Sequence, residues 1–324
     1  MKRERFLSLL VMVVFASCLP AAPAAGQTGA AMRLTPMRTP WEFRGSWSIS
    51  GEGSVEGATD EADLHQYNTS IRWREDPADR QSLSAGFVYE HVEVLTTSPL
   101  LPDRLVDFDA GVGFGLGEAA GWSFEGVLGA GYAGVSPFSD AQAVYFKADL
   151  IATHAFDEQG TMTLHLALSH DGNRVIFPDL PLPAAAFVHR VSPEFTYVVG
   201  FPANSLRWTP LEELRVELSL FAFSSLAASV NFELAPGIWV FALTDSTTNG
   251  YRLDIEDFDR RLFLSQSRGE LGVRFEPTEQ VTVEAAVGYS WDREFERGFD
   301  LRDTTTVAEL SDEPYIRFGL RFGF

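Results

Sequence analysis

Ser169 and His170 are the two neighbouring residues of this sequence whose side chains together could perform covalent catalysis. A serine hydroxyl activated by a histidine base can attack the ester bond of a lipid, and His165 and Asp171 stand close by in the sequence. Residues 161–170, however, alternate apolar and polar side chains as a β-strand does. Because successive side chains of a strand point to opposite faces, Ser169 and His170 would be held apart, and a lipid hydrolase is a minor alternative.

No metal or cofactor site is predicted from the other residues that commonly bind ions or phosphates. The single cysteine, Cys18, excludes a disulfide scaffold and a cysteine-based metal site. Four histidines are isolated and show no ligand spacing: His65, His91, His154 and His189. The glycines at alternate positions from 111 to 117 run through a strand pattern with no helix after it, so they form no phosphate-binding loop. We expect them to pack closely against an interior side chain.

The charge balance argues against nucleic acid as a partner. The 324 residues include 45 acidic and 25 basic side chains, a formal net charge of −20. A chain this acidic is repelled by phosphate backbones. Much of the negative charge falls in the polar stretches 54–63, 245–258 and 295–312, none of which has the spacing of a calcium-binding loop. We expect these stretches to be solvated loops.

The first 26 residues have the three-part layout of a secretory signal peptide. Basic residues come first, and an apolar run at 6–15 and a segment of small residues follow. An apolar run of about ten residues is too short to cross a membrane as a helix. We predict cleavage after Ala24 or Gly26. The alternative is a lipoprotein signal in which Cys18 is acylated.

Alternation of apolar and polar residues with period 2 dominates the rest of the chain. It is clearest at 106–116, 122–132 and 144–152, and each run predicts a strand with two chemically different faces. Short turns and longer polar connections alternate between the runs, as they do in transmembrane barrels. We therefore predict an all-β fold, a transmembrane antiparallel up-and-down β-barrel of 12 to 14 strands. The region 189–245 decides between the two counts.

Tryptophans fall at strand ends, where a barrel would meet the two membrane interfaces. Aromatic rings with a polar tip prefer these interfaces, whereas a soluble β-sandwich would hold its tryptophans in mid-strand. The predicted membrane-interface girdle consists of Trp41, Trp73, Trp122, Trp208 and Trp239 at the periplasmic end, and Trp291 toward the other.

Charged residues on the polar strand faces gather near the periplasmic end of the predicted lumen. Arg274, Glu284 and Arg321 come from three consecutive strands and could form an Arg–Glu–Arg cluster. Five more candidates lie at comparable depth: Glu42, Arg44, Glu125, Arg215 and Glu217. Two readings stay open. The charges either satisfy one another and fill the lumen, or they form a constriction that selects solutes by size and sign.

The last strand resembles the C-terminal signature of bacterial outer-membrane β-barrels. Its apolar residues alternate with polar ones and end on a terminal aromatic: Ile316, Phe318, Leu320, Phe322 and Phe324. The segment Gly200 to Pro202, followed by Leu206 to Pro210 and Leu214, is similar to a hinge in an outer-membrane barrel family of unknown function. The resemblance implies a Gram-negative outer membrane, export through the periplasm, and reading of the last strand by the barrel-assembly machinery.

These patterns predict three parts of the chain: a signal peptide at 1–26, a short periplasmic segment at 27–40 and an outer-membrane barrel at 41–324. The best single function is a passive pore or uptake channel for small solutes of unknown identity. The alternatives are a non-conducting structural or surface-interaction barrel and, less favoured, an outer-membrane lipid hydrolase. The expected partners are outer-membrane lipid and lipopolysaccharide, with the barrel-assembly machinery during biogenesis. We expect no enzyme activity, no cofactor and no nucleic acid.

Overall fold

The computed structural model describes residues 33–34, 37–51, 53–56, 60–138, 141–222, 224–253 and 261–324. The predicted signal peptide and Cys18 lie outside these residues. In the described part, no helix is long and apolar enough to cross a membrane.

The described chain consists almost entirely of β-strands and one short 3-10 helix. Their bounds are β1 (Trp41–Ser50), β2 (Ala62–Arg74), β3 (Ser84–Thr96), β4 (Arg104–Ala119), β5 (Trp122–Gly134), η1 (Ala141–Ala143), β6 (Val144–Ala155), β7 (Met162–Asp171), β8 (Leu182–Ser192), β9 (Phe195–Phe201), β10 (Ala203–Leu211), β11 (Leu214–Phe221), β12 (Ser225–Ala235), β13 (Ile238–Arg252), β14 (Arg261–Thr278), β15 (Val281–Gly298), β16 (Thr304–Leu310) and β17 (Glu313–Gly323).

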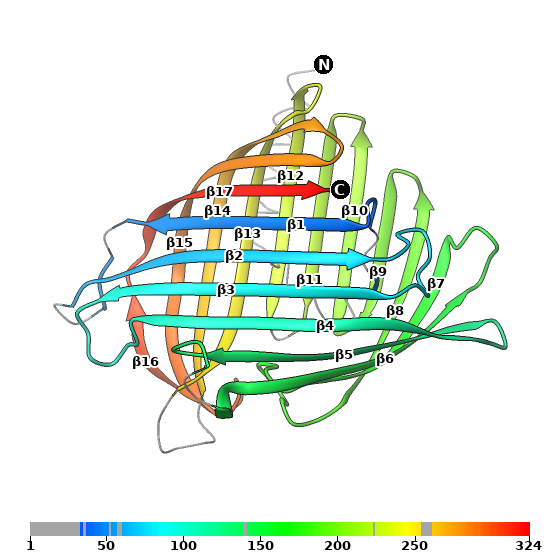
Figure 1. Cartoon of the computed structure of the whole chain (residues 1–324). Coiled ribbons are helices and arrows are strands. Elements are labelled where there is room, and N and C mark those ends of the chain that lie inside the picture. The colour runs from blue at the N-terminus through cyan, green and yellow to red at the C-terminus, as the bar shows by residue number, and fades with distance from the viewer. Residues whose placement is uncertain are drawn as a thin grey trace.

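The strands close into one antiparallel barrel. From β1 to β15 each strand pairs with the next in sequence, and β1 pairs with both β2 and β17, which lie on either side of it in Figure 1. β16 and β17 pair with successive parts of β15, so together they occupy one place in the wall. The 17 strands of the described residues therefore make a closed barrel with 16 strand positions in its wall.

The expected 12 to 14 strands were too few. The difference lies in residues 182–211, which form the three strands β8, β9 and β10. Pro193 and Pro202 lie in the two turns between them, where the missing backbone N–H is tolerated. The run at 184–188 is uniformly apolar, so it lacks the alternation that reveals a strand.

The two ends of the barrel differ in their connections. One end, here called the turn end, holds the start of β1, the end of β17 and seven connections, at 75–83, 120–121, 156–161, 193–194, 212–213, 236–237 and 279–280. The other end, the loop end, holds connections such as 97–103, 135–143 and 172–181. The predicted alternation of short turns and longer connections is confirmed in part, because 75–83 is long and the turn at Pro202, at the loop end, is short.

The wall is not equally high around the barrel. β9, β10 and β11 have 7, 9 and 8 residues, whereas β14 and β15 have 18 each. A tilted strand needs about 9 to 11 residues to cross a bilayer. The long strands therefore rise well beyond the low part of the wall at the loop end.

The outer face of the wall is apolar and exposed. Leu128, Phe146 and Leu271 on three different strands are each more than half exposed, at 59%, 66% and 65%. Their neighbours in sequence point inward, and apart from Val127 they are polar or small. The barrel thus has its apolar surface outside and its charges inside, which is the reverse of a water-soluble barrel.

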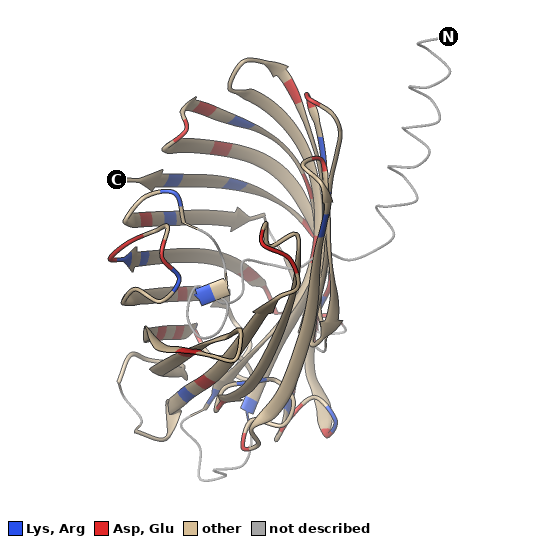
Figure 2. Ribbon diagram, turned by 90° about the vertical axis from the view of Figure 1, so that its right-hand side faces the viewer, with Lys and Arg blue, Asp and Glu red and all other residues tan. Residues whose placement is uncertain are grey.

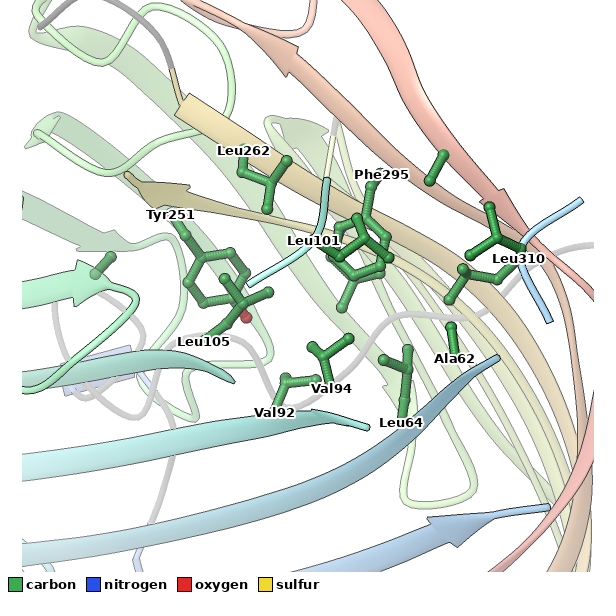
Figure 3. Close-up of a cluster of buried hydrophobic side chains, with 14 of the residues drawn as sticks. Ala62, Leu64, Val92, Val94, Leu101, Leu105, Tyr251, Leu262, Phe295 and Leu310 are labelled. Atoms are coloured by element: carbon green, nitrogen blue, oxygen red, sulfur yellow. The ribbon is translucent and has the colours of Figure 1, made fainter. Parts of the chain in front are cut away.

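Opposite walls touch inside the loop end. Val92 and Leu105 of one wall and Tyr251, Leu262 and Phe295 of the other are almost fully buried in one apolar cluster, whose side chains point toward one another in Figure 3. This cross-barrel core closes part of the interior, and the remaining space lies beside it.

Candidate functional site

A cavity of about 890 Å³ lies in the interior beside the cross-barrel core. Its lining includes Arg44 and Arg321 near the turn end and Asn173, Pro202 and Ser224 at the loop end. The cavity therefore extends along the barrel from one end toward the other. Basic and acidic residues occur on adjacent strands of the wall (Figure 2), so its surface is strongly charged.

Carboxylates gather around one lysine on the β4 to β7 side of the cavity. The Lys147 ammonium contacts Asp109 and lies 3.4 Å from Asp171. The Tyr145 hydroxyl donates a 2.8 Å hydrogen bond to Asp107. All five residues line the cavity, so this part of its wall carries an excess of acidic groups.

The predicted Arg–Glu–Arg cluster exists with a different second arginine. Arg274 Nε lies 2.7 Å from Glu284, and the partner on the other side is Arg317, at 3.0 Å. Arg321 instead lies 3.3 Å from Glu42 of β1. Glu284 is paired with Gly319, which places Arg317 and Arg321 two residues away on either side, so the register alone leaves both arginines available to it.

Glu42 is shared by three arginines. Arg44 and Arg72 lie 2.5 and 2.8 Å from its carboxylate, and Arg321 completes the group. Sequence reasoning named Glu42 and Arg44 but missed Arg72. The antiparallel register of β1 and β2, which pairs Glu42 with Arg72, was the signal that could have found it.

Glu125 belongs to a separate cluster that includes the segment before β1. Arg33 Nε lies 2.8 Å and Arg80 Nη2 3.0 Å from its carboxylate. Arg33 also donates to the Ser84 hydroxyl at 2.9 Å, and its carbonyl accepts from Arg74 at 3.0 Å. At least Arg33 of the predicted periplasmic segment thus lies buried inside the barrel.

The glycine repeat of β4 provides the space for that arginine. A Cβ on Gly113 would lie 2.5 Å from Arg33 Cδ, and a Cβ on Gly115 would meet Gln81. The prediction that these glycines pack closely against an interior side chain is confirmed for Gly113 and Gly115, whereas a Cβ on Gly111 would make only ordinary contacts and one on Gly117 would meet no described atom within 4 Å.

Arg215 and Glu217 do not pair with each other. Glu217 lies 2.8 Å from Arg207 of β10, whereas the Arg215 guanidinium stacks over Trp239 with its Cζ 5.2 Å from the ring centroid. Trp239 is only 7% exposed and lies under an arginine of the cavity. Its ring therefore faces the interior and is not part of an outer girdle, because Trp239 is paired with Arg274, which also points inward.

Four of the other predicted girdle residues have the expected places along the strands, and Trp291 does not. Trp41, Trp73, Trp122 and Trp208 lie within four residues of the turn end of their strands, and Trp41 stacks on Phe324 with centroids 6.1 Å apart. Trp291 lies in the middle of the long strand β15, ten residues from its start. Whether these rings meet a membrane interface stays a prediction.

The residues of the C-terminal signature lie on the outer face of β17 and at its end. Ile316, Phe318 and Leu320 are 45%, 49% and 41% exposed, and Phe322 stacks on Phe43 with centroids 4.8 Å apart. The terminal Phe324 is 61% exposed. This apolar face is therefore accessible on the strand that closes the barrel against β1.

The residues considered for catalysis are not assembled into a site. The Ser169 hydroxyl accepts a hydrogen bond from Arg174 at 3.2 Å, and His165 contacts Thr153 at 2.9 Å. His170 follows Ser169 on β7 and points to the opposite face. In the described ranges no group of three or more His, Cys, Asp or Glu side chains could hold a metal ion.

The connection 172–181 crosses the loop end toward the opposite wall. Leu301 N donates to Val175 O at 3.0 Å, and the Arg302 guanidinium stacks on Phe177 at 4.0 Å. Arg261 of β14 donates to the carbonyl of Arg174 at 2.9 Å. Since β7 and β15 are on opposite sides of the barrel, the connection 172–181, here called the strap, spans the loop end.

The fold and the cavity define the class of this protein as a closed antiparallel β-barrel with an apolar exterior and a charged interior. No family model and no curated protein sequence matches the chain. Among solved structures, it is similar to a deltaS2S3 mutant of the TodX monoaromatic hydrocarbon channel, with TM-score 0.42, 11% identity and 92% and 93% of the two chains covered.

Two further solved barrels show weaker similarity. The outer membrane protein Omp33 of Acinetobacter baumannii gives a TM-score of 0.37 at 8% identity, covering 88% of this chain and 98% of that one. The KdgM porin gives 0.27 at 6% identity, covering 86% and 99%. These values describe a general likeness between barrels and carry no information about a shared activity.

Proposed function

We propose that this protein is an outer-membrane β-barrel that passes small polar solutes through its interior cavity. The observation that carries the proposal is the lining of the cavity, which includes charged and hydroxyl side chains from both ends of the barrel. A path lined by polar groups offers hydrophilic solutes a route across a bilayer, and its charges discriminate among them.

The exterior supports the membrane location. Exposed apolar side chains cover the outward faces of the strands, and such a surface is stable in lipid and not in water. In this proposal the turn end faces the periplasm and the loop end faces outward, as in other barrels of this kind. Outer-membrane lipid and lipopolysaccharide surround the wall, and the barrel-assembly machinery reads β17 during biogenesis.

A non-conducting structural barrel is the second candidate, because the cross-barrel core narrows the interior. Phe295, Leu262 and Leu105 are fully buried between opposite walls. If the remaining cavity is blocked under membrane conditions, the barrel serves as a structural or surface-interaction protein.

Conductance in planar bilayers separates the two candidates, and β8 offers a matched pair of variants. Ala184 lines the cavity, and its neighbour Ala185 is exposed on the opposite face of the strand. We expect the wild-type barrel to conduct. Ala184→Trp places an indole in the cavity and lowers the single-channel conductance by about half or more, whereas Ala185→Trp places it in lipid and leaves the conductance unchanged.

Two results would contradict the pore. One is the absence of channel events from correctly inserted protein, which would favour the structural barrel. The other is an equal effect of the two tryptophans, which would place the conducting path outside this cavity. Heat-modifiable migration in gels checks that each variant is folded.

A further inference from the structure

Arg215 differs from the other arginines at the turn end of the cavity. Each of the others contacts a carboxylate: Arg44, Arg207, Arg274, Arg317 and Arg321. The Arg215 guanidinium stacks on Trp239, and among the described residues it makes no ion pair. A positive charge that lines a cavity without a counter-charge is available to a solute.

Trp239 supplies a second donor at the same place. Its side chain is 7% exposed, and its indole Nε1 has no hydrogen-bond partner in the described part of the chain. Buried N–H groups nearly always have an acceptor, because leaving one unpaired is destabilising. An acceptor brought by a bound solute would satisfy this group.

The side chains across the strand pairs from Arg215 and Trp239 form hydrogen bonds with other groups. Asn231, which is paired with Arg215 across β11 and β12, accepts a hydrogen bond from Arg274 at 3.1 Å. Glu233, paired with Trp239, accepts from the backbone N–H of Gly237 at 2.9 Å. Stacking on a ring fixes the plane of a guanidinium and leaves its edge N–H groups free for two parallel hydrogen bonds.

We propose that Arg215 and the indole N–H of Trp239 form a binding subsite for an oxyanion, the carboxylate or phosphate group of a small solute. The planar fork of Arg215 fits two oxygens of such a group, and Trp239 donates to the same group from the ring beneath. The inference rests on the proposed function, because a solute reaches this subsite by entering the cavity.

The test is isothermal titration of the folded barrel in detergent with sodium acetate and, separately, with sodium phosphate, in a sodium chloride background. Arg215→Gln removes the charged fork and weakens binding about ten-fold. Trp239→Phe keeps an aromatic ring beneath Arg215 but removes the N–H, and weakens binding about three-fold. The control is Arg207→Gln, whose guanidinium is already bound by Glu217 and which changes the affinity by less than about two-fold.

Binding of only one of the two anions supports the subsite and identifies its chemistry as carboxylate or phosphate. The subsite is overturned if neither anion binds the wild-type barrel, or if Arg215→Gln and Arg207→Gln weaken binding equally. Conductance of the same preparations keeps the two proposals apart. A barrel that conducts but binds no oxyanion refutes the subsite alone, and one that binds but does not conduct refutes the pore alone.

Discussion

The Arg33 guanidinium lies 2.8 Å from the Glu125 carboxylate, and both side chains are almost completely buried inside the turn end of the barrel. Arg33 belongs to the segment before β1, whereas Glu125 is in β5. Part of the segment that precedes β1 therefore helps to fill the interior of the barrel. Arg80 shares the same carboxylate at 3.0 Å.

Arg33→Ala is expected to destabilise the barrel and to widen its turn end. Removing one partner of a buried ion pair costs about 3 to 5 kcal/mol, and the lower value applies here because Arg80 still neutralises Glu125. The midpoint of urea unfolding should fall, and the single-channel conductance should rise because a buried side chain has left the interior.

Arg38→Ala is the control for this prediction. Arg38 is close by in the sequence, but its side chain is 76% exposed and lies 3.7 Å from Glu279, which is 89% exposed. Such a surface pair contributes about 0 to 1 kcal/mol. If both variants conduct like the wild type, Arg33 does not restrict the path.

Gly113→Ala should reproduce the effect of removing Arg33. The added Cβ would lie 2.5 Å from Arg33 Cδ and 2.8 Å from Ser84 Oγ, so Arg33 must move. Gly111 lies two residues away on the same face, and a Cβ there would meet its nearest atom at 3.5 Å, an ordinary contact. We expect Gly113→Ala to lower the unfolding midpoint and Gly111→Ala to leave it nearly unchanged. Equal unfolding midpoints for the two variants would show that Arg33 can move aside without loss of stability.

Much of this architecture could be predicted from the sequence, because a wall with lipid on one side and polar groups on the other leaves a period-2 pattern. The same pattern locates the turns and the inward position of Arg274 and Glu284. It fails at 184–188, where three alanines, a phenylalanine and a valine carry no polar alternation. This stretch is part of β8 and lies next to the two turns that raise the strand count to 16.

Predicting which interior charges pair with each other requires the strand register, which the period-2 pattern does not contain. The register of β15 and β17 pairs Glu284 with Gly319 and leaves Arg317 and Arg321 two residues away on either side, and Arg321 is bound instead by Glu42 of β1. The inward position of Trp239 likewise depends on its pairing with Arg274. Arg33 could not be found at all, because it precedes the first strand and meets Glu125 at a separation of 92 residues.

Asp300 anchors the strap at the mouth, and Asp300→Asn should loosen it. Its carboxylate accepts from Arg302 Nη2 at 2.6 Å and from the backbone N–H of Phe177 at 3.3 Å. The variant loses the charge that holds Arg302 over Phe177, so limited proteolysis within 172–181 should become faster. Asp303→Asn, in the same loop, is the matched control. Equal cleavage of the two variants would mean that Asp300 does not hold the strap.

Acid should loosen the strap in the same way. The Arg302 guanidinium hydrogen-bonded to Asp300 lowers the pKa of this carboxyl below its ordinary value of 3.8. A group whose pKa is lowered in the docked state stabilises that state fully above its ordinary pKa, and the contribution is lost as the pH falls through the lowered value. Proteolysis of 172–181 by an acid-active protease should therefore rise below about pH 3.8, and Asp300→Asn should remove this dependence.

Phe295 links the two walls at the cross-barrel core, where it is 0% exposed. Phe295→Ala leaves a cavity between the two walls, and such truncations lower the free energy of unfolding by about 3 to 5 kcal/mol. Phe275→Ala is the matched control, since Phe275 is 48% exposed on the outer surface and loses only contacts that lipid can replace. Urea unfolding in liposomes should show a large loss for Phe295→Ala alone. Similar losses would mean that the core adds nothing beyond the strand pairing, which alone would then hold the barrel closed.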